Sequence, residues 1–144
     1  MAHHCHCALI TCEDFRLHQK KDGRNYLSDF IKTLDKDCDI ITRGGAIQDL
    51  VRPKTPGFAE SLLRDIEVSV KLHDIKILYL VNHTNCGAYG HFGFTDSNEE
   101  KNRHAQDLKA AKTKILGIYP HLEVKAMLFE LQPETSDIYE IKEL

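Results

Sequence analysis

The sequence lacks any long apolar stretch and any surplus of positive charge. In 144 residues, no mostly apolar run approaches the roughly 20 residues that a membrane-spanning helix needs. The start of the chain lacks the basic flank and apolar core of a secretory signal, so we expect a cytoplasmic location. The formal net charge of -3 leaves no basic excess to attract phosphates. We therefore expect neither nucleic acid nor a membrane as a partner.

The overall composition is that of an ordinary globular protein. Hydrophobic residues make up 42% of the chain and charged residues 28%, which excludes a disordered, collagen-like or coiled-coil chain. The length suits one domain better than two, and no linker or repeat divides it. We expect residues 1–144 to form a single domain.

The five cysteines and nine histidines are the first informative feature. An odd number of cysteines without a secretory signal argues against disulfides, and the lack of a Cys-x-x-Cys pattern argues against thiol redox chemistry. Cys38 opens an apolar run and is expected to be a small buried side chain. Cys5 and Cys7 lie in the His- and Cys-rich start of the chain, which we interpret as a frayed terminus leading into the first strand rather than as a metal-chelating tail. Cys12 and Cys86 remain as candidates for chemistry.

The pattern of apolar residues alternates between strands and helices. Short apolar runs predict strands at 7–12, 38–42, 76–83, 123–131 and 137–142, and helical spacing predicts helices at 25–36, 58–73 and 102–119, the last with Ile118 on its inner face. Residues 87–98 are expected to form an irregular loop that can include a short helix. Strands that alternate with helices predict an α/β fold, with a mostly parallel, doubly wound sheet of four to five strands and helices on both faces.

The same topology predicts where a site should lie. In a doubly wound sheet, ligands bind beyond the carboxyl ends of the strands, where the winding reverses. If the second and third strands flank the first, this point falls between Cys12 at the end of the first strand and His83 at the end of the third, with Cys86 in the following loop. Two thiolates and one imidazole suit Zn²⁺ with a fourth position left open.

The residues after Cys12 add two charges to this predicted site. Asp14 and Arg16 can point the same way in an extended segment and form a bidentate ion pair. Asp14 either ligates the metal as a fourth residue or accepts a hydrogen bond from bound water, and Arg16 would decide which. A plain surface ion pair is the alternative.

These motifs together resemble the β-class carbonic anhydrases. That family carries Cys-x-Asp-x-Arg after its first core strand, as in 12–16 here, and His-x-x-Cys after its third, as in 83–86. It also has a Gly-Gly turn after the second strand, matched by 43–46, and a crossover helix where Glu60 stands. The resemblance implies that Cys12, His83 and Cys86 bind zinc and that Asp14 and Arg16 form the catalytic dyad.

The resemblance also implies an activity, the reversible hydration of CO2 to bicarbonate and a proton by zinc-bound hydroxide. Asp14 would orient the hydroxide, and His91 or His104 could relay the proton, although a solvated surface position is the ordinary state of each. Two alternatives stay open. One is hydrolysis of carbonyl sulfide or carbon disulfide, and the other is a non-catalytic zinc scaffold or sensor in which Asp14 closes the fourth position.

Two further expectations concern assembly and Arg43. The resemblance implies a homodimer or a larger even assembly, and the contact could use the edge at Ile40 and Ile41 together with the helix over 58–70. Arg43 follows the second strand at the same end as the predicted site. It either adds positive charge near the metal, or is solvated or paired with Asp49 or Asp39, and we favour the second interpretation.

Overall fold

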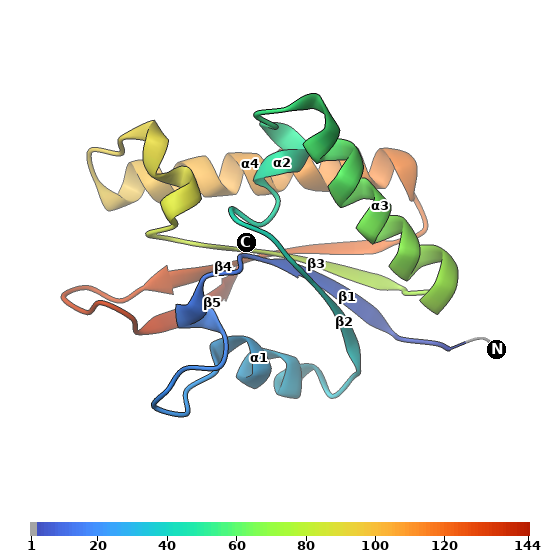
Figure 1. Cartoon of the computed structure of the whole chain (residues 1–144), viewed down its shortest axis with the longest axis horizontal. Helices are drawn as coiled ribbons and strands as arrows, with labels where there is room; N and C mark the ends of the chain where they lie inside the picture. The colour runs from blue at the N-terminus through green and yellow to red at the C-terminus, as the bar shows by residue number, and fades with distance from the viewer. Residues whose placement is uncertain (1–2) are drawn as a thin grey trace.

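The computed structural model describes residues 3–144 and is built on one five-stranded sheet (Figure 1). The strands are β1 (Cys7–Thr11), β2 (Cys38–Thr42), β3 (Ile77–His83), β4 (Glu123–Leu131) and β5 (Tyr139–Glu143). Their order is β2-β1-β3-β4-β5; the first four pair in parallel and β5 is antiparallel to β4. The winding therefore reverses between β1 and β3, as the sequence predicted.

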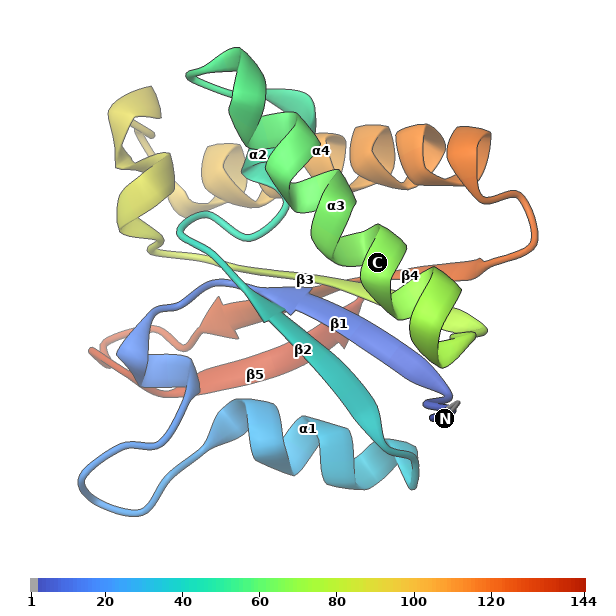
Figure 2. The same ribbon diagram turned by 45° about the vertical axis from the view of Figure 1, so that its right-hand side comes forward.

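Helices cover both faces of this sheet. Figures 1 and 2 show α1 (Tyr26–Leu34) on one face and α2 (Gln48–Val51), α3 (Pro56–His73) and α4 (Ser97–Ile118) on the other. Two 3₁₀ helices, η1 (Phe15–Leu17) and η2 (Gly87–Phe92), follow β1 and β3. The predicted α/β fold with a mostly parallel, doubly wound sheet is confirmed.

The two faces have separate apolar cores because neighbouring residues of a strand point to opposite sides. In β1, Cys7 and Leu9 pack toward α1, whereas Ala8 and Ile10 pack toward α3 and α4. Every residue of β1 and β3 is buried. This is why both strands are apolar without alternation, as strands covered on both faces should be.

Helix ends follow local sequence signals. The Asn25 side chain accepts a hydrogen bond of 2.8 Å from the Ser28 N–H at the start of α1, and α3 has Pro56 in its first turn. Both helices end at an aspartate in the left-handed region, Asp35 (φ 51°) and Asp74 (φ 53°). Asparagine and aspartate tolerate this conformation better than most residues do.

The sequence prediction was wrong at α4 in two ways. The helix begins at Ser97 rather than near residue 102, because the Asp96 side chain accepts a 2.8 Å hydrogen bond from the Glu99 N–H and caps it. Ile118, expected on the inner face, is 47% exposed at the end of the helix. The short helix α2 was also not predicted. The early start of α4 places Glu100 near the loop that follows β3.

No helix within residues 3–144 has both the length and the apolar character needed to cross a membrane.

Candidate metal centre

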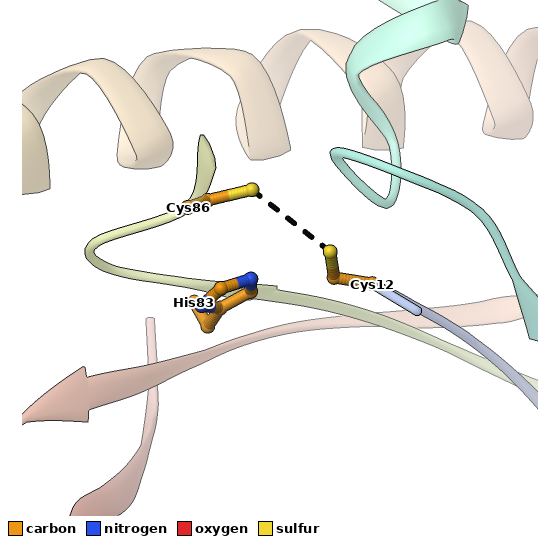
Figure 3. Close-up of side chains that lie close together, drawn as sticks. All are labelled: Cys12, His83 and Cys86. Atoms are coloured by element: carbon orange, nitrogen blue, oxygen red, sulfur yellow. Dashed lines mark hydrogen bonds between the residues drawn. The ribbon is translucent and has the colours of Figure 1, made fainter. Parts of the chain in front are cut away.

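Two strand ends and one loop bring together Cys12, His83 and Cys86. Cys12 directly follows β1, His83 is the last residue of β3, and Cys86 lies three residues further along. All three side chains are buried, and their candidate ligand atoms lie within 4.8 Å of one another (Figure 3). The two sulfur atoms are 3.9 Å apart. Register places Thr11 beside Val81, so the neighbouring strands end at the same edge of the sheet.

Only one of the two ring nitrogens of His83 forms a hydrogen bond within residues 3–144. Its Nδ1 lies 2.9 Å from the Thr84 carbonyl oxygen, which can only accept, so Nδ1 carries the proton. The Nε2 atom therefore presents a lone pair. It is buried and has no hydrogen-bond partner among residues 3–144. A buried nitrogen without a partner is costly, and a metal ion at this point would satisfy it.

The two thiols affect each other's pKa in opposite directions. A hydrogen bond from the Cys86 thiol lowers the pKa of Cys12, and the His83 ring acts in the same direction. The same hydrogen bond, together with burial, raises the pKa of Cys86. A thiolate is the form of cysteine that binds metals. Two sulfur ligands and one imidazole nitrogen fit Zn²⁺ and leave a fourth position open.

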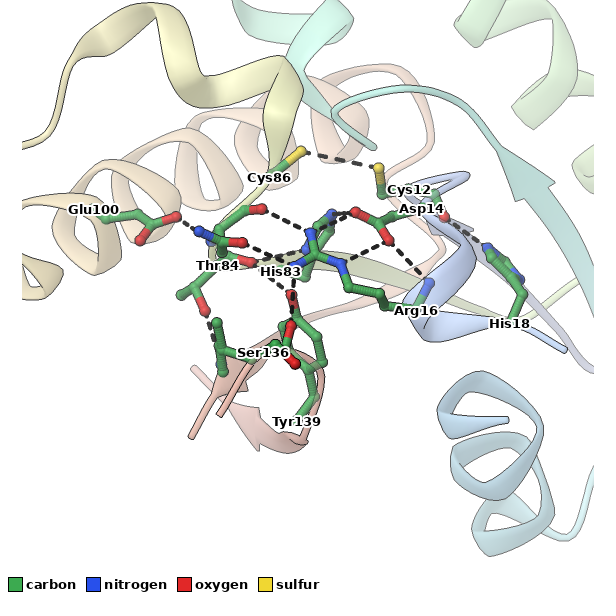
Figure 4. A network of polar contacts seen from close by, with 12 residues as sticks. Cys12, Asp14, Arg16, His18, His83, Thr84, Cys86, Glu100, Ser136 and Tyr139 are labelled. Atoms are coloured by element: carbon green, nitrogen blue, oxygen red, sulfur yellow. Dashed lines mark hydrogen bonds and ion pairs between the residues drawn. The ribbon is translucent and has the colours of Figure 1, made fainter. Parts of the chain in front are cut away.

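Asp14 and Arg16 lie beside this cluster in a bidentate pair. Arg16 Nη2 is 2.7 Å from Asp14 Oδ2, and Arg16 Nε is 3.0 Å from Asp14 Oδ1 (Figure 4). The Arg16 backbone N–H donates to Oδ1 as well, at 2.9 Å, so that Asp14 caps η1. The expectation of an extended segment was thus wrong: a capped 3₁₀ turn, rather than strand alternation, aligns the two side chains.

The pair fixes the charge and direction of Asp14. Hydrogen bonds from Arg16 lower the pKa of Asp14 to about 2. Oδ1 accepts two hydrogen bonds, whereas Oδ2 accepts one and faces the cluster, 3.9 Å from His83 Nε2. The structure therefore places Asp14 next to the candidate ligands, with both carboxylate oxygens engaged by Arg16.

The other side of the Arg16 guanidinium contacts Asn85. Nη1 donates to Asn85 Oδ1 at 2.8 Å, and Nη2 donates to the Asn85 carbonyl at 2.9 Å. Asn85 lies between His83 and Cys86 and has a left-handed backbone, with φ of 57°. Sequence reasoning missed this residue. The available signal was an asparagine, a residue common in that conformation, between two candidate ligands.

Tyr139 of β5 contacts both the His83 ring and the carbonyl that orients it. Its hydroxyl donates at 3.2 Å to the Thr84 carbonyl, which also receives His83 Nδ1–H. The Tyr139 ring lies edge-on to the His83 ring, with centroids 5.8 Å apart, and 5.7 Å from the Arg16 guanidinium carbon. Sequence reasoning missed it as well. No local motif marks a residue that comes from the far end of the chain.

An open cavity of about 640 Å³ leads to the site. Asp14, Arg16, Asn85, Cys86 and Glu100 are among its lining residues. Small polar or linear molecules can therefore approach the cluster from the side where the Asp14–Arg16 pair lies. A cavity of about 830 Å³ between α1 and β2 touches none of the three candidate ligands, so it is unconnected with this chemistry.

The three remaining candidates lie away from the cluster or inside the core. Arg43 Nε is 3.1 Å from Asp49 Oδ2, which is one of the two ion pairs considered for it. His91 is exposed, as expected. The expectation of a solvated surface position for His104 was wrong, since this side chain is fully buried and its ring centroid lies 4.2 Å from that of Tyr89.

Solved carbonic anhydrases share this fold. The structure is similar to the carbonic anhydrase of Streptococcus mutans, with a TM-score of 0.59 and 13% identity over 99% of this chain and 82% of that one. It is also similar to the β-carbonic anhydrase CafA of Aspergillus fumigatus, with a TM-score of 0.53 and 14% identity over 99% of this chain and 76% of that one. At such identities the likeness concerns the fold alone.

Sequence comparison gives nearer relatives. An uncharacterised protein of Rickettsia conorii is 30% identical over 139 residues, covering 92% of this chain and 72% of the relative. One of Rickettsia bellii is 30% identical over 138 residues, covering 92% and 80%. The family model described as "Putative carbonic anhydrase" matches residues 2–138. This match spans nearly the whole chain and agrees with the β-class fold, and the chain belongs to this carbonic anhydrase family.

Proposed function

We propose that this protein is a zinc-dependent carbonic anhydrase that hydrates CO2 reversibly to bicarbonate and a proton. The observation that carries the proposal is the buried cluster of two thiols and an imidazole nitrogen that has no partner among residues 3–144. Beside it lies a carboxylate that an arginine holds in place. Membership of the carbonic anhydrase family supports the same activity.

Cys12, His83 and Cys86 would hold the metal. Their donor atoms converge, and His83 is already in the tautomer that leaves Nε2 free to bind. When bound, Zn²⁺ lowers the pKa of a coordinated water from 15.7 towards about 7, which supplies a nucleophile near neutral pH.

Asp14 would orient the attacking water. Its carboxylate is ionised, because Arg16 lowers its pKa to about 2, and so it can only accept hydrogen bonds. Oδ2, the oxygen with the spare acceptor capacity, faces the cluster. A hydrogen bond accepted there directs the water's remaining lone pair toward the carbon of CO2, which lowers the barrier through orientation.

Arg16 would keep Asp14 in this role. Three hydrogen bonds tie Asp14 to Arg16, and a move of the carboxylate onto the metal would have to break them. The arrangement argues against a non-catalytic scaffold in which Asp14 closes the fourth position. Asp14 as a permanent metal ligand is thus the weaker of the two roles considered for it.

Assembly is a second part of the proposal. We propose that residues 1–144 act as one catalytic domain and pair into a homodimer or larger even oligomer through the β2 edge. Strand β2 is the last strand on its side of the sheet, and Ile40 within it is 51% exposed. Phe58 on α3 is 43% exposed. Work in the cytoplasm stays a prediction from the sequence.

The test is metal analysis combined with a CO2 hydration assay on the same protein sample. We expect one zinc per chain. CO2 hydration, measured by stopped flow, should be lost when a chelator removes the metal and should return when Zn²⁺ is added. Carbonyl sulfide and carbon disulfide serve as parallel substrates. Zinc-loaded protein that hydrates no CO2 over pH 6–9 would overturn the proposed reaction, and turnover of a sulfur substrate alone would replace it.

A further inference from the structure

The hydrogen bonds around Arg16 do not end at Asp14. The guanidinium has two sides, and the side away from Asp14 is occupied by two oxygens of Asn85, at 2.8 Å and 2.9 Å. The Ser136 carbonyl adds a third, longer contact of 3.4 Å. Arg16 is therefore bound at both ends of its planar fork, which restricts rotation far more than one ion pair does.

Asn85 is not held by packing, because it is exposed. Its position comes from the backbone. It adopts a left-handed conformation, with φ of 57°, and its N–H donates to the Glu100 carboxylate. Glu100 comes from the first turn of α4, and its side chain is only 17% exposed. A charged acceptor on a rigid helix thus fixes the loop residue that binds Arg16.

The charge of Glu100 is consistent with this contact. Burial by itself raises the pKa of a carboxyl group, but the His104 ring and the Asn85 N–H favour the carboxylate, and the net pKa is lowered. His104 Nε2 lies 3.8 Å from Glu100 Oε1. An ionised carboxylate accepts the Asn85 N–H as a charge-assisted hydrogen bond.

We propose that Asn85 and Glu100 are positioning residues for the hydration reaction, which rests on the proposed function. Asn85 fixes the Arg16 guanidinium, Arg16 fixes Asp14, and Glu100 fixes Asn85 from α4. Both residues line the cavity that leads to the site, but neither belongs to the group of three candidate ligands. Their effect is to keep the Asp14 oxygen directed at the cluster throughout turnover.

The first test is a pair of substitutions at residue 85. Asn85→Gly keeps the left-handed backbone and the carbonyl contact but removes the Oδ1 acceptor. Asn85→Asp keeps an acceptor in a residue that tolerates the same conformation. We expect kcat of Asn85→Gly to fall about 10- to 100-fold with KM and zinc content unchanged, and Asn85→Asp to restore most of the loss.

A second readout does not depend on activity. Hydrogen exchange of the Arg16 Nη protons and rotation about its Nε–Cζ bond can be measured by NMR with ¹⁵N- and ¹³C-labelled arginine. We expect both to be at least tenfold faster in Asn85→Gly than in the wild type or in Asn85→Asp. Asp35→Gly is the matched control, because Asp35 is also exposed and left-handed, with φ of 51°, but lies at the end of α1.

Glu100 supplies a test from outside the loop. Glu100→Ala leaves the Asn85 N–H without its acceptor and should speed Arg16 exchange, whereas Glu100→Gln offers an amide oxygen and should stay near the wild type. If Asn85→Gly does not fold, the Glu100 variants alone test whether this contact positions Arg16. Arg16 exchange and kcat equal to the wild type in both Asn85→Gly and Glu100→Ala would overturn the proposal. A zinc-loaded wild type without hydration activity would instead refute the function, and the exchange rates would still decide whether the contact positions Arg16.

Discussion

At the scale of single residues, one backbone carbonyl oxygen sets the tautomer of the His83 imidazole. The Thr84 carbonyl accepts the Nδ1 proton at 2.9 Å and so leaves the lone pair on Nε2, inside the cluster. Tyr139 donates to the same carbonyl from β5 and keeps it in place. His83 is therefore a candidate ligand because these two contacts orient its ring and leave Nε2 unprotonated.

The cysteines of the cluster give the first prediction. Cys86→Ala should reduce bound zinc from one per chain to well below one tenth, because the ion loses a thiolate that ties the loop after β3 to the end of β1. Metal analysis by mass spectrometry after dialysis measures this. Cys38→Ala, at a partly buried thiol on β2, is the control and should keep its zinc. Full occupancy in Cys86→Ala would show that the metal binds elsewhere.

The Asp14–Arg16 pair gives the second prediction. Asp14→Asn and Arg16→Ala should each lower kcat/KM by about 100-fold or more while zinc content is unchanged, since orientation of the water is lost but the ligands remain. Stopped-flow hydration and metal analysis on the same samples measure both.

The chain contains a matched control for this pair. Asp22 and Arg24 have the same spacing and form the same kind of pair, with Arg24 Nη2 2.6 Å from Asp22 Oδ2, on an exposed loop. Asp22→Asn and Arg24→Ala should therefore leave activity within about twofold of the wild type. If Asp14→Asn and Arg16→Ala also leave activity within about twofold of the wild type, the Asp14–Arg16 pair is only a surface ion pair.

At the scale of elements, Glu130 joins three of them. It lies in β4, 7% exposed, and its carboxylate pairs with Lys142 of β5 and, at 2.9 Å, with Lys101 of α4. The β5 strand carries Tyr139, and α4 carries Glu100. The contact therefore anchors both elements that support the candidate site from outside the ligand loop.

This anchor predicts a pH dependence of stability. Lys142 and, after it, Lys101 lower the pKa of Glu130 in the folded protein. A carboxyl whose folded pKa lies below its unfolded value of about 4.3 stabilises the fold above that pH and loses this stabilisation as the pH falls through the folded pKa. The free energy of unfolding of the wild type should thus exceed that of Glu130→Gln at pH 7, and the difference should shrink toward pH 3.

Urea denaturation at several pH values measures this difference. Glu60→Gln is the control, because Glu60 is exposed on α3 and has no ion pair among residues 3–144. A Glu130→Gln difference that is constant with pH would mean that the ion pairs do not stabilise the fold.

At the scale of the whole molecule, the proposed assembly depends on the exposed edge of β2. It is an edge strand, and an edge offers unpaired backbone groups to a second sheet. We predict that Ile40→Lys converts the oligomer to a monomer, since a charge at this apolar position opposes close approach. Light scattering after size-exclusion chromatography at micromolar concentration measures the mass.

A second apolar surface residue controls for the added charge. Ile118 on α4 is 47% exposed, close to the 51% of Ile40, but lies on another part of the molecule. Ile118→Lys should leave the mass unchanged. A wild type that is monomeric and fully active would remove the proposed assembly altogether.

The local pattern was sufficient for the sheet and for the position of the candidate site. Continuous apolar runs marked β1 and β3 because both faces of these strands are buried, and the order of strands and helices then placed Cys12 and His83 at one edge. The start of α4 was missed because apolar spacing begins later than the Asp96 cap, which acts through a hydrogen bond rather than through burial.

The sequence by itself determined the strands, the candidate ligands at their carboxyl ends and the family, because these depend on residue type and spacing along the chain. Asp-x-Arg occurs twice, in Asp14–Arg16 and in Asp22–Arg24, and only the first pair follows Cys12. Arg16 Nε and Nη2 reach different oxygens of Asp14, whereas Arg24 Nε and Nη2 both reach Asp22 Oδ2. Only the tertiary structure decided that one faces the cluster, since Asn85 and Tyr139 reach Arg16 from distant parts of the chain. Contacts of that kind follow from how strands and loops pack in space, and no local pattern records them.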